Sequence, residues 1–374
     1  MDAFGRALLP LPEAPIAVGF SGGVDSTTLL HALASSVVAR AQGLRAIHVH
    51  HGLHPDADAW AAHCGRLCAD LDVPLQVARV QVDHTAGSGP EGAARAARLG
   101  VFSSNLSDGE VLALAHHRDD QAETILLRLM RGAGGDGLAA MRRRSRLGSL
   151  HLWRPLLDLP RSALRDYAMT HALRWIEDPS NTDAGYDRNF LRNRVLPLLT
   201  ERWPQASRNL ARSAGLLAEQ SDLLAAASDA MLNRLLDADT AICVHALLAQ
   251  SRRQRARLLR AWLRRLHFPA MTAAILSSIE GDLLPARADG DACVEWAGVA
   301  LYRWRDRLHA QRQTIPLQDD WNVTWDGRKP LQLPDGASLA LISADAFESP
   351  VTVRARHGGE RIHLPHREHS HALK

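Results

Sequence analysis

The first two hundred residues alternate short apolar runs with longer stretches whose apolar residues recur at helical spacing. The runs predict buried strands, and the stretches predict helices. We expect strands at Ile16–Phe20, Leu44–His50, Leu75–Val80 and Val111–Ala115, and helices at Thr27–Arg40, Ala57–Leu71, Glu91–Asn105 and Asp119–Arg131. This alternation predicts an α/β fold with a doubly wound, mainly parallel sheet. Ligands of such folds bind beyond the carboxyl ends of the strands.

Helical patterns dominate the rest of the chain up to its last segment. We expect a loop rich in glycine and arginine at Gly132–Gly148. Helices are expected at Ser162–Ala172, Arg188–Leu199 and Trp203–Leu236, followed by a mostly helical unit at Ala241–Leu308. Leu317–Lys374 has short runs of Val, Leu and Trp broken by glycine turns, which predicts a β-rich segment. We therefore expect three domains, at 1–202, 203–315 and 316–374, the last of them incomplete.

The composition is that of an ordinary globular protein. The 374 residues suit two or three domains, with 46% hydrophobic and 23% charged residues. The net charge of +3 permits an RNA partner without demanding one. Only Lys329 and Lys374 are lysines among the 44 basic residues, so arginine, which suits bidentate phosphate contacts, carries the positive charge. No signal peptide opens the chain and no apolar run could span a bilayer, so we expect a cytoplasmic protein.

The four cysteines have no spacing typical of a disulfide-stapled domain. Cys64 and Cys68 lie four residues apart on a predicted helix and therefore share a face. A metal-binding pair is one interpretation, but no second pair follows at zinc spacing. We expect both to be buried, reduced thiols.

A candidate phosphate loop, Ser21-Gly22-Gly23-Val24-Asp25-Ser26, lies between the first strand and the first helix. Two glycines let the backbone approach an anion, and the next helix aims its free N–H groups and positive dipole end at it. The serines add hydroxyl donors, and Asp25 is useful if Mg²⁺ bridges it to phosphate oxygens. A plain serine-capped turn is the alternative. The loop lacks the Gly-Lys-Ser/Thr ending of a Walker A motif and resembles the PP-loop of ATP pyrophosphatases. That resemblance implies ATP, cleaved between its α and β phosphates.

The second strand ends in His48-Val49-His50-His51-Gly52-Leu53, beside the candidate loop. A polar, glycine-containing strand end at this place would hold the nucleoside of ATP, so we take His50, His51 and Gly52 as nucleotide-binding candidates. Zinc is the rival interpretation, because His54 follows closely. A nearby set of carboxylates or cysteines is missing from the sequence around it.

The fourth strand leads into His116-His117-Arg118-Asp119-Asp120-Gln121-Ala122-Glu123-Thr124. Asp120 and Glu123 are three apart in the first turn of a helix and share a face. Acidic residues at a helix start also favour the dipole, which is the structural alternative. This string and its continuation through Arg131 resemble the tRNA(Ile)-lysidine synthetase family, and in part the related tRNA thiolases.

Three further stretches carry the same resemblance. Trp175–Asn181 leads to Tyr186–Asn193, in which Arg188, Asn189 and Arg192 form one polar helical face. A solvated arginine face is the alternative there. A helix of the family that ends in an Ala-Arg motif matches this chain around Arg95 and Arg98. Leu99 stands where the family usually has tyrosine. A structural role for Arg98 is as well supported as a functional one. The resemblance covers roughly residues 15 to 310.

The resemblance implies a reaction and its participants. The C2 oxygen of the wobble cytidine of tRNA(Ile) with a CAU anticodon attacks the α-phosphate of ATP, and pyrophosphate leaves. The ε-amine of free lysine then displaces AMP to form lysidine. ATP and Mg²⁺ are the implied cofactors, and a homodimer is a further expectation.

Roles follow for the candidate residues as hypotheses. Asp25 and Asp120 would serve the metal. Asp120 and Glu123 would receive the lysine ammonium, which must lose a proton before the amine attacks. Arg95 and Arg192 would meet the lysine carboxylate or the developing phosphate charge. Further substrate-binding candidates are His117, Arg131, Arg188 and Asn189.

Arg252–Arg265 carries seven arginines, with Arg253, Arg257, Arg260 and Arg264 at helical spacing. This face predicts either an RNA phosphate platform or a solvated surface. Val351–Arg361 resembles the start of the family's last domain, so the end of the chain is expected to be either truncated or naturally short. The histidines His363, His366, His369 and His371 are expected in a frayed tail, with adventitious metal binding as the alternative.

Three other functions compete with lysine transfer. A tRNA thiolase would use paired cysteines or an iron–sulfur cluster, and Cys64 with Cys68 is the only close pair. A small-molecule synthetase of the NAD or GMP type would not need the long, arginine-bearing C-terminal half. A non-catalytic RNA-binding protein would not need the complete loop together with Asp120 and Glu123.

Overall fold

The computed structural model describes residues 3–52, 54–80, 89–179, 183, 185–238, 240–287, 292–313, 317–342, 344–355, 361–362 and 371–372. The side chains of residues 3, 89–95, 361–362 and 371–372 lie outside the description. The chain divides into two compact units, Met1–Ala227 and Ser228–Lys374. The domain boundaries at 202/203 and 315/316 stay a prediction. Among the described helices, none has the length and apolar character needed to cross a membrane.

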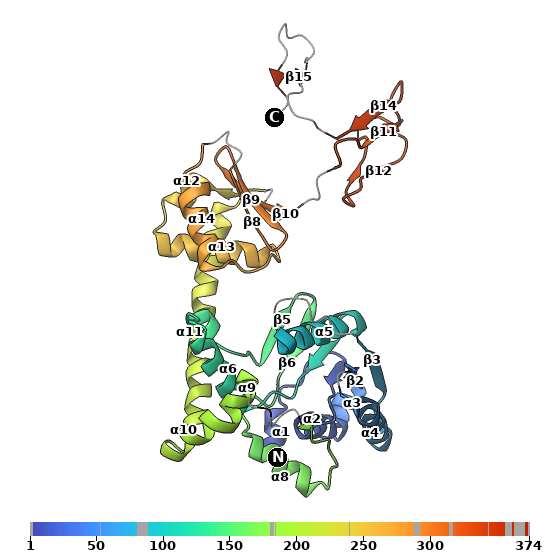
Figure 1. Ribbon diagram of the computed structural model, residues 1–374, viewed down its shortest axis with the longest axis vertical. Coiled ribbons are helices and arrows are strands. Elements are labelled where there is room, and N and C mark those ends of the chain that lie inside the picture. Colours follow the sequence, from blue (N-terminus) through green and yellow to red (C-terminus); the bar gives the residue numbers. More distant parts are fainter. Residues whose placement is uncertain are drawn as a thin grey trace. The chain divides into compact units, whose positions relative to one another are not determined.

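A six-stranded sheet forms the centre of the first unit (Figure 1). Its strands are β1 (Ile16–Gly19), β2 (Leu44–His50), β3 (Leu75–Arg79), β4 (Val111–Ala113), β5 (Arg144–Leu147) and β6 (Leu150–Trp153), in the order β3-β2-β1-β4-β6-β5. All neighbours are parallel except β5, which pairs antiparallel with β6. The doubly wound, mainly parallel α/β fold is thereby confirmed. The chain runs outward from β1 to β3 and then returns to the other side of β1 at β4, so the topological switch point lies between β1 and β4.

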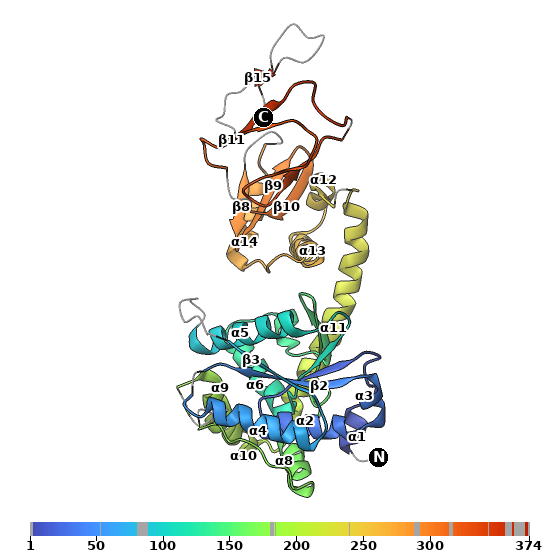
Figure 2. The ribbon, with the colours of Figure 1, turned by 90° about the vertical axis from the view of Figure 1, so that its right-hand side faces the viewer.

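The helices of this unit are α1 (Ala3–Ala7), α2 (Val24–Ala34), α3 (Val37–Gln42), α4 (Ala57–Asp70), α5 (Gly89–Asn105), α6 (Arg118–Met130), α7 (Gly135–Leu138), α8 (Arg161–Thr170), α9 (Asp187–Phe190), the π-helical turn η2 (Leu191–Val195), α10 (Leu196–Arg202) and α11 (Ala206–Leu235). Figure 2 shows α5 on one face of the sheet and α2 and α4 on the other.

Alternate residues of β1 build the two halves of the core, because successive strand side chains point to opposite faces. Ile16 and Val18 pack in one cluster with side chains of α2, α4 and α8. Ala17 packs in the other cluster, with Phe102 of α5. Both faces of the sheet are therefore covered, which explains why the strands read as continuous apolar runs.

Two local expectations for the first unit were wrong. The helix expected at Thr27–Arg40 is broken between α2 and α3, because the Ser36 side chain accepts a hydrogen bond from the Ala39 amide and starts a new helix. The loop expected at Gly132–Gly148 contains α7 and β5. Strand β5 forms because the antiparallel hairpin lets it pair with β6 at the edge of the sheet.

The second unit combines helices with a four-stranded antiparallel sheet. Its helical elements are the end of α11, α12 (Val244–Leu248), α13 (Arg252–Arg265), α14 (Ala273–Ser278) and the π-helical turn η3 (Ile279–Leu283). The strands β7 (Ile242–Cys243), β8 (Cys293–Trp296), β9 (Val299–Trp304) and β10 (Arg307–Arg312) lie in the order β7-β10-β9-β8. Trp262 of α13 is 1% exposed in the core between them.

The expectation of a mostly helical unit at Ala241–Leu308 was therefore wrong for its last part. A two-residue turn, Ala297-Gly298, joins β8 to β9, and both residues have positive φ (45° and 77°). Turns of this kind match the twist of antiparallel strands and favour a hairpin over a helix.

The β-rich prediction for Leu317–Lys374 is confirmed within the described residues. Short antiparallel pairs form between β11 (Asn322–Trp325) and β14 (Val351–Arg354), β12 (Leu331–Gln332) and β13 (Ser338–Leu339), and β15 (Arg361–Ile362) and β16 (His371–Ala372). His363, His366 and His369, and the side chain of His371, lie outside the description, so the tail expectation stays a prediction.

Candidate functional site

The candidate site lies at the switch point of the sheet, where the segments after β1 and β4 leave its carboxyl edge. The first segment is the loop Ser21–Ser26, which runs into α2. The second is His116–His117, which runs into α6. A parallel sheet opens a crevice at this point because its two neighbouring connections diverge. The two motifs singled out in the sequence therefore meet at one place.

The loop Ser21–Ser26 is held by its own two serines. Ser26 Oγ donates to the Gly23 carbonyl (3.1 Å) and accepts from the Ser21 amide (3.2 Å), and the two hydroxyls are 3.1 Å apart. Gly23 is the N-cap of α2, and no side chain caps this helix. The first amides of α2 are thus available to an anion, as the phosphate-loop prediction requires.

Gly22 is the tightest position of the loop. Its φ is +83°, and an added Cβ would lie 2.5 Å from Cδ1 of Ile176 and 2.9 Å from Sγ of Cys64. The Ile176 amide also donates a 2.8 Å hydrogen bond to the Gly22 carbonyl. Only glycine fits this backbone and this space. The segment after α8 therefore packs closely against the loop and supports it.

The start of α6 is fixed by a reciprocal cap between His117 and Asp120. The His117 amide donates to Oδ2 of Asp120 (3.0 Å), and the Asp120 amide donates to Nδ1 of His117 (3.3 Å). Because Nδ1 accepts, a proton on the His117 ring resides on Nε2. That nitrogen lies 3.4 Å from Oδ2 of Asp120 and 3.7 Å from Oδ2 of Asp25. The cap therefore places one imidazole N–H between the carboxylates of the two motifs.

Two arginines from η2 and α9 converge on the carboxylates of α6. Arg188 donates to Oε2 of Glu123 (2.7 Å) and Oδ1 of Asp120 (2.9 Å). Arg192 donates to Oε1 of Glu123 (2.7 Å) and to the same Asp120 oxygen (2.9 Å). The two arginines are four residues apart and the two acids three residues apart, so each pair lies on one side of its helix. The two pairs point toward each other. We call these four side chains the arginine–carboxylate cluster.

Burial makes this cluster electrostatically strong. The side chain of Glu123 is 1% exposed and that of Asp120 10%, against 24% for Arg188 and 21% for Arg192. Burial alone would raise the pKa of Asp120, but His117 and Arg188 together bring it below its ordinary range. Their carboxylate partners in turn raise the pKa of both guanidinium groups against the effect of burial. Asp120, Arg188 and Arg192 therefore stay charged near neutral pH.

Asp25 faces this cluster with an unused oxygen. Its Oδ1 is buried and has no hydrogen-bond partner among the described residues, as is also true of His117 Nε2. Both Asp120 oxygens already accept hydrogen bonds from the protein. Mg²⁺ is usually held by one or two carboxylates together with phosphates and water, so Asp25 fits such an ion. Nowhere in the described residues do three His, Cys, Asp or Glu side chains form a metal-binding group.

The histidine strand end lies beside the phosphate loop, since β2 neighbours β1. His48 Nδ1 is 2.9 Å from the Phe20 carbonyl, and His50 Nε2 is 3.1 Å from Oδ1 of Asp58. Each contact uses one ring nitrogen, and among the described residues these histidines do not join a group of three possible metal ligands. Burial, aided by the charge of Arg98, lowers the pKa of His51 to about 4. A neutral His51 suits a nucleoside better than a phosphate, but the nucleotide role of His50, His51 and Gly52 stays a prediction.

Three predicted residues lie apart from the cluster or outside the description. Arg131 is exposed and lies 3.8 Å from Asp187. Asn189 donates to the Asp183 carbonyl (2.9 Å). Arg95 is in α5, and its side chain is not among those described. Their substrate-binding roles stay predictions.

Cys64 and Cys68 are buried, as expected, with 0% and 1% exposure. Burial raises the pKa of the Cys64 thiol to about 12 and that of Cys68 to about 11. Sulfur transfer requires an accessible thiolate. The pair is therefore poorly suited to carry sulfur, which argues against a thiolase.

One residue at the site was not among the candidates. Arg161 begins α8, and its Nε lies 3.8 Å from Oδ1 of Asp25. In the sequence it follows the string Arg154-Pro155-Leu156-Leu157, just before the helix expected at Ser162–Ala172, and no role was assigned to it. The available signal was its place in the connection after β6, which ends at the same edge of the sheet.

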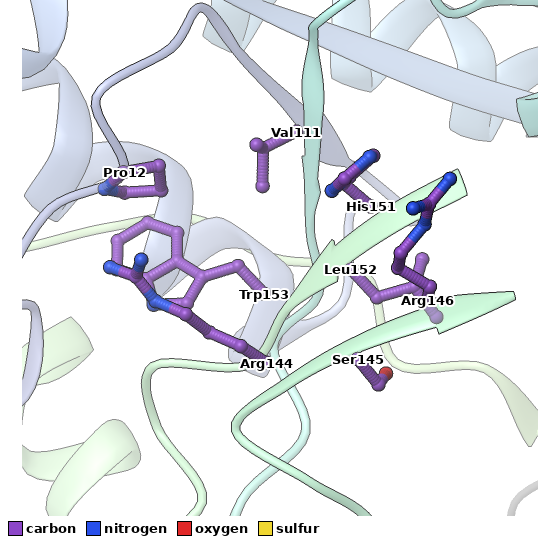
Figure 3. A pocket seen from close by; sticks show the side chains of 8 residues that line it. All are labelled: Pro12, Val111, Arg144, Ser145, Arg146, His151, Leu152 and Trp153. Carbon is purple, nitrogen blue, oxygen red and sulfur yellow. The ribbon is translucent and has the colours of Figure 1, made fainter. Parts of the chain in front are cut away.

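A separate cavity of about 310 Å³ lies beside the β5–β6 hairpin (Figure 3). It is lined by Pro12, Val111, Arg144, Ser145, Arg146, His151, Leu152 and Trp153, none of which is a predicted site residue. Val111 and His151 come early in their strands, whereas the candidate site follows the strand ends. The cavity is therefore distinct from the site.

Comparison with known proteins identifies both units. The PP-loop domain family matches residues 3–199, and the TilS substrate binding domain family matches residues 242–309. A tRNA(Ile)-lysidine synthase of Xanthomonas axonopodis pv. citri (strain 306) is 53% identical over 99% of this chain and 85% of its own length. The enzyme of the same name from Xylella fastidiosa (strain Temecula1 / ATCC 700964) is 52% identical over 98% of this chain and 85% of its own length. That of Alkalilimnicola ehrlichii (strain ATCC BAA-1101 / DSM 17681 / MLHE-1) is 42% identical over 95% of this chain and 81% of its own length. Identity of this extent across both units, together with the assembled site, shows that the chain belongs to the tRNA(Ile)-lysidine synthase family.

Proposed function

We propose that the protein ligates lysine to C2 of the wobble cytidine of tRNA(Ile) with a CAU anticodon. ATP adenylates the base first, and the products are lysidine, AMP and pyrophosphate. The observation that carries this proposal is the arginine–carboxylate cluster directly beside the phosphate loop. A site that only bound ATP would not need four further charged groups buried at its edge.

The loop Ser21–Ser26 receives the phosphates of ATP. Its open helix N-terminus and serine hydroxyls bind oxygens whose negative charge grows as pyrophosphate leaves. Asp25 would hold Mg²⁺, which would offset that charge when bound. Oδ1 of Asp25 accepts no hydrogen bond from the described residues, whereas both oxygens of Asp120 do, so Asp25 suits this role better.

The two carboxylates of the cluster have different roles. Glu123, whose side chain is 1% exposed, acts through Arg188 and Arg192 by holding both guanidinium groups in place. The two arginines direct their remaining donors to the lysine carboxylate or to the phosphates. Asp120 is the more exposed acid, and its negative charge attracts the lysine ammonium while its oxygens keep their hydrogen bonds from the protein. Its lowered pKa suits binding a cation and not accepting a proton from it.

The second unit would contribute to tRNA binding, and the two-domain match supports this assignment. Free lysine is the second substrate. A homodimer remains part of the proposal, on the basis of the family resemblance alone.

One assay tests the proposed reaction. The protein is incubated with ATP, radiolabelled lysine and an unmodified tRNA(Ile) transcript, and label in the tRNA is counted. The matched control is the same transcript with the wobble cytidine changed to uridine. We expect label that depends on both ATP and the cytidine. No label from a protein that still binds ATP would refute lysine transfer.

A further inference from the structure

Arg161 directs a buried, unused donor at the centre of the site. Its Nε has no hydrogen-bond partner among the described residues, and neither has Oδ1 of Asp25, 3.8 Å away. That separation is an ion pair without a hydrogen bond. Buried donors are nearly always paired, so a buried guanidinium N–H left open at a binding site indicates a missing acceptor.

The position of Arg161 is fixed by the elements that build the site. Its backbone amide donates to Oδ2 of Asp119 in α6 (2.9 Å). Just before it, the Leu159 carbonyl accepts from the Arg118 amide (2.9 Å). One turn later, Thr28 of α2 donates to the Leu164 carbonyl (3.3 Å). Helix α8 is thus tied to both helices that begin at the switch point.

Three helices therefore begin around Asp25. Asp25 lies in the first turn of α2, His117 caps α6, and Arg161 is the first residue of α8. Each helix start contributes positive potential, which falls off within a turn. Arg161 adds a full charge, and its side chain is 37% exposed.

Arg161 differs in this respect from the arginines of the cluster. Arg188 and Arg192 each donate hydrogen bonds to two carboxylates, whereas Arg161 donates to neither oxygen of Asp25. A purely structural arginine would be expected to close its ion pair. A ligand with several oxygens beside Asp25 would satisfy Arg161 Nε at once.

We infer that Arg161 is a phosphate-contacting residue of the ATP site. Its guanidinium donates to the phosphates that the loop Ser21–Ser26 receives. The inference rests on the ATP-binding half of the proposed function and is independent of lysine and tRNA.

The test compares Arg161→Gln with the wild-type protein by isothermal titration calorimetry, without tRNA or lysine. We expect ATP to bind about tenfold more weakly or worse, as for a lost charge-assisted hydrogen bond. Adenosine, which has no phosphate, should bind both proteins equally. Arg165→Gln, an exposed arginine one turn later on α8, is the matched control and should bind ATP as the wild type does.

A titration with EDTA separates phosphate contact from the mere positioning of Asp25. If Arg161 contacts phosphate, the loss of ATP affinity in Arg161→Gln persists without Mg²⁺. An ATP affinity equal to wild type under this condition would overturn the inference. Arg161→Lys, which keeps the charge, should recover part of the affinity; thermal melting shows that each variant is folded. Failure of the wild type to label tRNA would count against lysine transfer and leave this result unaffected.

Discussion

Arg192 Nε donates a 2.7 Å hydrogen bond to Oε1 of Glu123, a carboxylate whose side chain is 1% exposed. Arg188 reaches the other oxygen of the same group at 2.7 Å. A buried carboxylate that holds two arginines is costly to remove, because both guanidinium groups lose their partner at once. Glu123 thereby links the stability of the first unit to the geometry of its site.

Glu123→Gln should therefore reduce both stability and catalysis. We expect the free energy of unfolding to fall by about 3 kcal/mol, measured by urea denaturation, since a buried pair is broken. Lysine incorporation should show a raised KM for lysine, because Arg188 and Arg192 are released. A wild-type KM for lysine would show that Glu123 has no part in lysine binding.

Glu110→Gln is the matched control for this prediction. Glu110 is also a buried carboxylate paired with an arginine, Arg45, at 2.6 Å, but it lies before β4, away from the site. Its loss should destabilise the protein comparably and leave the KM for lysine unchanged below the melting temperature. Only the comparison of the two variants separates folding from function.

Gly22→Ala should weaken ATP binding and destabilise the fold together. The added Cβ would meet Ile176 and Cys64 at 2.5 Å and 2.9 Å, and the φ of +83° strains any L-residue. We expect at least a tenfold weaker affinity for ATP and a lower melting temperature. Both are measurable by calorimetry, the first by titration and the second by scanning.

Gly109→Ala isolates the backbone strain from the clash. Gly109 also has a positive φ (+79°), but nothing lies within 4 Å of its would-be Cβ. The strain alone costs about 1–2 kcal/mol. If Gly109→Ala reduced ATP affinity as much as Gly22→Ala, the close fit at Gly22 would not be the reason for its effect.

The sequence predicted each half of the site but not how the halves meet. Helical spacing shows that Asp120 and Glu123 share one face and that Arg188 and Arg192 share another, because spacing is a local property. Their contact joins residues at least 65 positions apart, so it depends on the packing of α9 and η2 against α6. Asp25 and Asp120 were expected to act alike as metal ligands, and only the structure distinguishes the free oxygen from the saturated carboxylate.

The missed elements have a similar explanation. Helices α13 and α14 and the turn η3 precede the strands β8–β10, so one helical pattern was predicted to continue to Leu308, although the Ala297-Gly298 turn signals a hairpin. Arg161 pairs with nothing near it in sequence. Its ion-pair partner Asp25 lies far before it in the sequence of the first unit, so no helix or strand periodicity could link the two residues.

His51 should make the stability of the protein depend on pH between about 6.5 and 4. Burial lowers its pKa to about 4, while an unfolded chain has a histidine pKa of about 6.5. In this window the unfolded state binds more protons, so the contribution of His51 is fully present above pH 6.5 and is lost as the pH falls. Urea unfolding at several pH values should show a shallower loss for His51→Asn than for the wild type. An identical pH slope in the two proteins would contradict this prediction.

The arginine face of α13 should control the salt dependence of tRNA binding. Arg253 and Arg260 are exposed and seven residues apart, so they lie on one side of a helix in the unit matched by the substrate binding domain. If each contacts a phosphate, Arg253→Gln with Arg260→Gln should reduce the slope of log K against log salt by about two, measured by filter binding. Arg255→Gln is the control on the same helix, because Arg255 donates to Glu280 (2.9 Å) and is not free for RNA. It should lower stability and keep the wild-type slope, whereas a full slope in the double variant would make the arginine face a solvated surface.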